Sequence, residues 1–146
     1  QLADQFGIGE ERMMNRPSNR YQAMEVSGLS GPRLVVFTYS HILAALRQGH
    51  RAIGQQDHEV RCRTFCRARD LIYELLFALN RDQGGDVARN LVGLYQYFIQ
   101  EISRIDLHPD LSRLEKLIEL VATLHETWES AAREVSEAPV PAALVE

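Results

Sequence analysis

Three side chains that bind soft metals stand at helical spacing near the middle of the sequence. His58, Cys62 and Cys66 are each four residues apart, so a helix would place them on one face. An imidazole and two thiolates are good zinc ligands, but a structural zinc site needs four ligands. The other histidines form no helical pair that could complete the set. We therefore expect no metal here, and cysteine is also a common small core residue.

No other arrangement of residues predicts catalysis or cofactor binding. A di-iron bundle requires Glu-x-x-His on two helices, and no glutamate in this chain is followed three residues later by histidine. The phosphate-binding patterns G-x-x-x-x-G-K and G-x-G-x-x-G are absent, as is the nucleophile elbow G-x-S-x-G. We expect a protein without enzyme activity and without a cofactor.

An arginine-rich segment follows the histidine and the cysteines. It contains Arg61, Arg63, Arg67 and Arg69, with acidic residues interleaved. Arginines can bind nucleic-acid phosphates, but a helix would spread these four over more than one face. The whole chain carries a net charge of −4. This pattern favours a charged helix surface, and we expect no nucleic-acid partner.

The apolar periodicity predicts four amphipathic helices, at about residues 32–54, 58–80, 86–105 and 110–135. Pro32 suits a first helical turn, Asp57 is a good N-cap, and Asp86 favours the dipole of the third helix. Gly84-Gly85 and Pro109 interrupt the chain between the later helices. Long helices with short connections become antiparallel neighbours, so we expect an all-α, up-down four-helix bundle over residues 31–137.

Both ends of the chain are predicted to be flexible segments outside this bundle. Residues 138–146 are punctuated by proline, and residues 1–30 lack a sustained apolar period. Within the first segment, Tyr21, Met24 and Val26 form a short apolar patch that could dock onto the bundle.

Two further sequence features concern the natural start of the protein and the compartment in which it functions. Met13 and Met14 are alternative natural starts, and residues 1–13 would then be largely foreign to the protein. The chain has no signal-peptide pattern and no run of ~18 apolar residues. We therefore expect a cytoplasmic protein that does not insert into a membrane.

The third predicted helix carries more apolar surface than a single core-facing stripe requires. Its main stripe is Val87, Leu91, Leu94, Phe98 and Ile102, and beside it run Val92, Tyr95 and Ile99. The second helix similarly adds Cys66, Tyr73 and Phe77 to its own stripe. Surplus apolar surface marks a partner site if it is exposed, whereas two packed neighbours would bury both stripes. Periodicity alone leaves both explanations open.

One long stretch of the sequence resembles a known family. It comprises Leu79-Asn80, Gly84-Gly85-Asp86-Val87-Ala88-Arg89-Asn90-Leu91 and Leu94-Tyr95-Gln96-Tyr97. It is similar to the pattern L-N…G-G-x-[IV]-A-x-N-L-x-x-L-Y-x-Y of the flagellar secretion chaperones called FliS, and the resemblance extends over roughly residues 21–132. Gly31 and Ser40 depart from the family, which usually has Ser or Thr at the first position and often Asp at the second.

The resemblance implies a cytoplasmic chaperone that binds the disordered C-terminal segment of flagellin. Such a protein prevents premature polymerisation and assists delivery to components of the flagellar export gate. In the family the client lies partly in apolar grooves, and the N-terminal segment can cover part of that surface. A non-catalytic helical bundle that self-associates through the same apolar stripe is the alternative.

Carried over to this chain, the resemblance implies a set of client-binding residues: Leu76, Phe77, Asn90, Leu91, Leu94, Tyr95 and Phe98. Asn90 would donate or accept hydrogen bonds with the client backbone, or would instead stabilise the turn at Gly84-Gly85. The patch of Tyr21, Met24 and Val26 would fold over the same groove and compete with the client.

Overall fold

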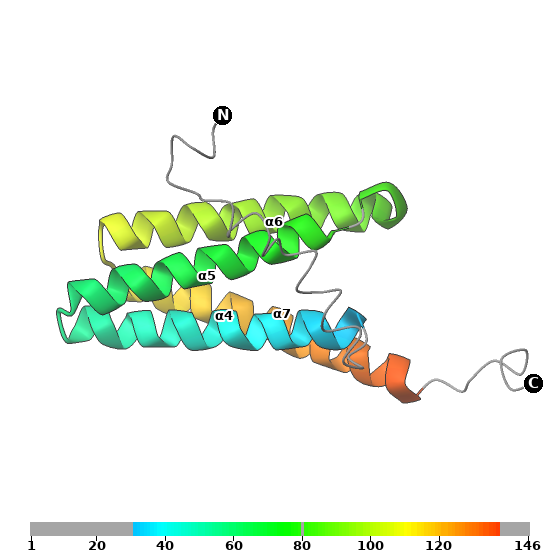
Figure 1. The fold of residues 1–146 in the computed structure, drawn as a ribbon, viewed down its shortest axis with the longest axis horizontal. Helices are drawn as coiled ribbons and strands as arrows, with labels where there is room; N and C mark the ends of the chain where they lie inside the picture. Colours follow the sequence, from blue (N-terminus) through cyan, green and yellow to red (C-terminus); the bar gives the residue numbers. More distant parts are fainter. Residues whose placement is uncertain (1–30, 80, 138–146) are drawn as a thin grey trace, which may run out of the picture.

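The computed structural model describes residues 31–79 and 81–137 and contains four helices in this part of the chain. They are α4 (Gly31–Gly54), α5 (His58–Ala78), α6 (Arg81–Leu107) and α7 (Leu111–Glu137). Each helix runs opposite to the one before it (Figure 1). The predicted all-α, up-down bundle is confirmed.

Short polar caps begin two of the helices, and an unusual backbone conformation interrupts a third. The carboxylate of Asp57 accepts the backbone N–H of Val60 at 3.1 Å, which confirms the predicted cap of α5. Asp110 accepts the N–H of Arg113 at the start of α7 in the same way. Gly85 has φ 54° and ψ −131°, a conformation that glycine tolerates best, and it separates the first turn of α6 from the remainder. The third helical segment therefore begins at Arg81, before the predicted break at Gly84-Gly85.

The core lies around α4, which packs extensively against both α5 and α7. The helix α6 packs mainly against α5 and contacts α7 much less. The fully buried side chains come from all four helices. The largest of them are Tyr39, Tyr95, Phe65, Phe98, Leu34, Ile42, Leu46, Ile72, Ile102, Ile105, Leu114 and Val121.

The predicted main stripe of α6 is only partly its inward face: Phe98 and Ile102 are buried as predicted, but the rest of the stripe is not. Tyr95, assigned to the second stripe, is 1% exposed, whereas Val87 of the main stripe is 67% exposed. The inward face of α6 instead consists of Ala88, Tyr95, Phe98, Ile102 and Ile105. Two adjacent apolar stripes can each satisfy the helical period, so the rotation of α6 depends on its neighbours and not on its own sequence.

A glycine of α4 lies directly against a side chain of α5. A Cβ atom on Gly49 would overlap the ring of Phe65 and lie 2.9 Å from its Cζ atom. Phe65 is completely buried, so its ring has no open space into which it could move. Gly49 is therefore required by packing, although glycine disfavours a helix interior.

We predict that Gly49→Ala lowers the unfolding free energy by about 1–2 kcal/mol, because overpacking outweighs the gain of ~1 kcal/mol in helix propensity. Gly93→Ala is the matched control, since a Cβ atom on Gly93 meets nothing within 4 Å. That control is expected to stabilise the bundle by up to ~1 kcal/mol. Urea unfolding followed by circular dichroism measures both changes, and a stabilised Gly49→Ala variant would contradict the packing argument.

A buried pair of tyrosines connects α4 to α6. The hydroxyl of Tyr39 donates a hydrogen bond to the hydroxyl of Tyr95 at 3.0 Å, and the indole of Trp128 lies 6.5 Å from the Tyr39 ring between centroids. Burial raises the pKa of Tyr39 above its ordinary value of 10.0, and the hydrogen bonds offset this only in part. The protonated form of Tyr39 is therefore the one that the folded bundle favours.

This shift makes the stability of the bundle depend on alkaline pH. In the unfolded chain Tyr39 ionises near pH ~10, and in the folded bundle it ionises at higher pH. The unfolded state therefore releases the proton first, and the unfolding free energy falls as pH rises above ~10. We expect Tyr39→Phe to cost about 0.5–1.5 kcal/mol at neutral pH and to make this alkaline decline less steep. Urea unfolding at a series of pH values tests the slope; equal slopes for the two proteins would refute it.

Candidate functional site

The two long sides of α6 face different helices, and three ion pairs show which helix each side faces. Asp106 lies 3.3 Å from Arg61 and 3.5 Å from Arg69, so its side of α6 faces α5. Glu101 pairs with Arg113, so its side faces α7. Residues seven apart lie on nearly the same side of a helix. Consequently Ile99 shares the side of Asp106, and Leu94 shares the side of Glu101.

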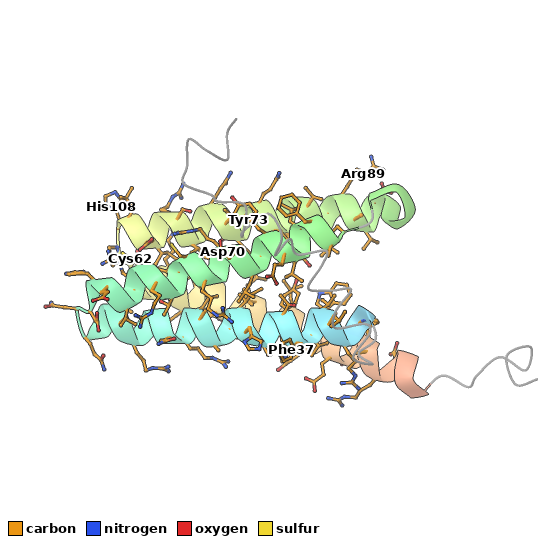
Figure 2. All side chains as sticks on the ribbon, viewed as in Figure 1. Phe37, Cys62, Asp70, Tyr73, Arg89 and His108 are labelled. Carbon is orange, nitrogen blue, oxygen red and sulfur yellow. The ribbon has the colours of Figure 1, made fainter. Side chains whose placement is uncertain are left out.

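Along the border between α5 and α6, two aromatic side chains are exposed. Tyr73 and Phe77 stack with their ring centroids 6.4 Å apart, and Phe77 is 69% exposed. Arg69 of α5 contacts α6, and Leu76 stands seven residues later, so Leu76 lies on the same border. The side chain of Leu76 packs partly against the core. Figure 2 shows Tyr73 and Cys62 at this edge of α5, with Phe37 on the outer edge of α4. We call the surface formed by Tyr73, Leu76 and Phe77 the α5 ridge.

On the other side of α6, the weak contact with α7 leaves a groove of about 590 Å³. We call it the α6–α7 groove, and its lining is Tyr97, Glu101, Arg104, Asp110, Ser112, Arg113, Lys116, Leu117 and Leu120. The Glu101–Arg113 ion pair crosses this lining, and Glu101 is itself buried. Tyr97 and Leu120 are exposed apolar side chains. The groove thus combines an apolar surface with several charged groups.

The structure separates the predicted client-binding residues into three environments. Tyr95 and Phe98 are each 1% exposed and belong to the core. Leu76 and Phe77 lie on the α5 ridge. Leu94 lies on the α7-facing side of α6, Leu91 packs partly against the core, and Asn90 is exposed. Tyr21, Met24 and Val26, predicted to dock onto this surface, lie outside the described residues.

Sequence reasoning missed most of the α6–α7 groove. Tyr97 enters only as part of the family pattern. Nothing in the sequence pattern assigns a binding role to Leu120, Arg104 or Lys116. A signal was present in Leu120, which stands three residues after Leu117 and four before Leu124 and so widens the apolar face of this helix on the side away from Val121. Such a residue indicates a second apolar face only once the neighbouring helix is known to be distant.

The residues that could have formed a metal site are occupied by arginine contacts. Both cysteines are exposed, so neither is the core residue that cysteine often is, and Cys66 lies off the buried stripe as predicted. Arg69 donates to the sulfur of Cys66 at 3.3 Å, and Arg61 contacts Nδ1 of His58 at 2.9 Å. Residues 31–79 and 81–137 contain no group of three or more His, Cys, Asp or Glu side chains able to hold a metal ion. Within the same ranges, no helix combines the length and apolar character needed to cross a membrane.

Comparison with known proteins identifies several flagellar secretion chaperones as relatives of this chain. The chain is 27% identical to the flagellar secretion chaperone FliS of Vibrio cholerae over 105 residues, which cover 72% of this chain and 77% of the relative. The FliS chaperone of Campylobacter jejuni is 29% identical over 117 residues, covering 80% of this chain and 91% of the relative. That of Bacillus subtilis is 23% identical over 118 residues, covering 81% and 87%. A family model described as "Flagellar protein FliS" matches residues 13–135, nearly the whole bundle, and the chain belongs to this family.

Proposed function

We propose that this protein is a cytoplasmic export chaperone that binds the disordered C-terminal segment of flagellin. It prevents premature polymerisation of flagellin and assists its delivery to the flagellar export apparatus. Membership of the FliS family supports this role. The structural observation that supports it is the presence of exposed apolar side chains on both sides of α6: Tyr73 and Phe77 on the α5 ridge, and Tyr97 and Leu120 in the α6–α7 groove.

A disordered client must lose conformational entropy when it binds, so the interface has to supply many favourable contacts. The α5 ridge and the α6–α7 groove lie on opposite sides of α6, and a client that wraps around this helix contacts both. Full burial of an aromatic or aliphatic side chain contributes about 1.5–3 kcal/mol. A few such contacts on each side offset the ordering of a segment that binds as amphipathic helices in grooves.

The client-binding residues in this proposal come from two helices. Leu76 and Phe77 belong to the α5 ridge, and Asn90, Leu91 and Leu94 belong to the surface of α6. Asn90 is exposed beside apolar neighbours, where its amide group suits hydrogen bonds to a client backbone. Tyr95 and Phe98 act indirectly, because their burial holds α6 in the rotation that presents the other residues.

We predict that Phe77→Ala weakens binding of a synthetic flagellin C-terminal peptide by about tenfold or more, because the client buries this ring. The unfolding free energy should change by less than ~0.5 kcal/mol, since the ring is exposed in the free protein. Phe37→Ala is the matched control: Phe37 is also an exposed phenylalanine but lies on the outer edge of α4 (Figure 2).

Isothermal titration calorimetry gives the affinities, and light scattering gives the mass of the complex. A one-to-one complex is expected. Equal affinities for Phe77→Ala and the unaltered protein would exclude the α5 ridge from the interface. Loss of a dimer in Phe77→Ala, with no peptide binding by the unaltered protein, would instead favour self-association through this surface.

The apolar patch of Tyr21, Met24 and Val26 is proposed to compete with the client for the groove. A chain that begins at residue 31 should therefore bind the peptide several-fold more tightly and with a faster association rate. A chain that begins at residue 14 keeps the patch and serves as the control. Stopped-flow fluorescence of Trp128, which lies in α7, follows association. Identical rates and affinities for all three chains would argue against competition.

A further inference from the structure

Cys66 stands in a positively charged stretch of α5. Within three positions on either side it has Arg63, Arg67 and Arg69 and no acid, whereas Cys62 has two arginines and an acid within the same distance. Both thiols are exposed, and the guanidinium of Arg69 donates to the sulfur of Cys66 at 3.3 Å. The thiol of Cys66 is therefore accessible to a reagent from solvent, and it lies beside cations that attract an anionic reagent.

Two of these arginines keep their charge available to a ligand. Arg69 pairs with Asp106 of α6, but Arg63 and Arg67 take part in none of the ion pairs between described residues. Arg63 stands three residues before Cys66, so the two side chains are neighbours on the helix surface. A reagent that carries carboxylate groups can pair with these guanidinium groups as its sulfur approaches the thiol.

We infer that Cys66 is a site of reversible modification by a small anionic disulfide, such as glutathione disulfide, and that this modification weakens client binding on the α5 ridge. The inference rests on the proposed function. The thiolate of Cys66 attacks one sulfur of the reagent, so a new S–S bond forms as the S–S bond of the reagent breaks. The leaving glutathione thiolate takes up the proton that Cys66 lost. The sulfur of Cys66 is thereby oxidised, and the leaving sulfur is reduced.

The helix prevents Cys62 from displacing the added group. Residues four apart on a helix have Cβ atoms about 5–6 Å apart, whereas a disulfide requires about 3.5–4.5 Å. Cys62 therefore cannot form a disulfide with Cys66 while α5 is intact. The added group leaves only when an external thiol attacks it, so the extent of modification depends on the ratio of thiol to disulfide around the protein.

The modified residue lies on the side of α5 that carries the α5 ridge. Cys66 stands seven residues before Tyr73, so the two lie on nearly the same side of the helix, about 10 Å apart along its axis. Figure 2 shows Cys62, one turn before Cys66, and Tyr73 along this edge of α5. A glutathionyl group is a tripeptide that spans about 10 Å when extended, so it can cover Tyr73. It also adds net negative charge beside the ridge, and the client loses apolar contacts there.

Four proteins are treated with glutathione disulfide and, separately, with cystamine, which is a cationic disulfide. They are the full chain, Cys66→Ser, Cys62→Ser and Arg63→Gln/Arg67→Gln. Intact-mass spectrometry counts the added groups over time, and peptide mapping locates them. Circular dichroism verifies that each protein is folded. Calorimetry then measures the affinity of the modified and unmodified proteins for the flagellin C-terminal peptide.

We expect the full chain to gain a glutathionyl group on Cys66 several-fold faster than on Cys62. Arg63→Gln/Arg67→Gln should react several-fold more slowly with glutathione disulfide but no more slowly with cystamine, because only the anionic reagent is attracted by the cations. Added salt should reduce this difference. The modified chain should bind the peptide about tenfold more weakly, and dithiothreitol should restore the affinity. Cys66→Ser, treated for the same time, should bind the peptide as tightly as the untreated chain does.

The assignment of Cys66 would be overturned by equal rates at Cys62, or by an equal effect of Arg63→Gln/Arg67→Gln on both reagents. Loss of two hydrogens without an added group would also overturn it, because the two cysteines would then have formed a disulfide. Equal affinities of the modified and unmodified chains would overturn the effect on client binding and leave the proposed function intact. Failure of the unmodified chain to bind the peptide would refute the proposed function and this effect with it, whereas the mass-spectrometric result on Cys66 would be unchanged.

Discussion

The buried contact between Tyr39 and Tyr95 joins the central helix α4 to α6 and determines which residues of α6 face the core. Two adjacent apolar stripes compete for the inward position on α6, and in the observed rotation the phenol of Tyr95 accepts a hydrogen bond from the buried hydroxyl of Tyr39. A rotation that turned Tyr95 to solvent would leave the Tyr39 hydroxyl in the core without this acceptor, at a cost of about 1–3 kcal/mol, which favours the observed rotation. With α6 fixed in this way, Val87 is exposed and Leu94 is turned toward α7.

The ion pairs of α6 reinforce one end of the bundle more than the other. Glu101 and Asp106, which connect α6 to α7 and to α5, both lie in its C-terminal half. Among the described residues, the ion pair in its N-terminal half joins Arg89 to Asp86 of the same helix. The N-terminal half of α6 is therefore held by apolar contacts, and there the distance to α7 increases (Figure 1).

Exposed apolar side chains carry a risk of aggregation. In this bundle they are divided between two separate surfaces, which limits that risk. The α5 ridge and the α6–α7 groove are separated by the width of α6, so neither forms one large continuous patch. Charged side chains also accompany each surface: Arg69 and Asp106 lie beside the ridge, and Arg104 and Lys116 are part of the lining of the groove. A long flexible client can reach both surfaces, whereas a rigid globular protein contacts one of them more easily.

The sequence by itself determined the helices and their connections, because these depend on local chemistry. The caps at Asp57, the break near Gly85 and the apolar period of α4 and α7 each follow from residues within a few positions. The family pattern in and around α6 could be found in the same way. Tertiary structure alone decided the rotation of α6, the burial of Tyr95 and Phe98, and the exposure of the two cysteines. It also created the α6–α7 groove, because a groove depends on the distance between two helices and no residue on either helix encodes that distance alone.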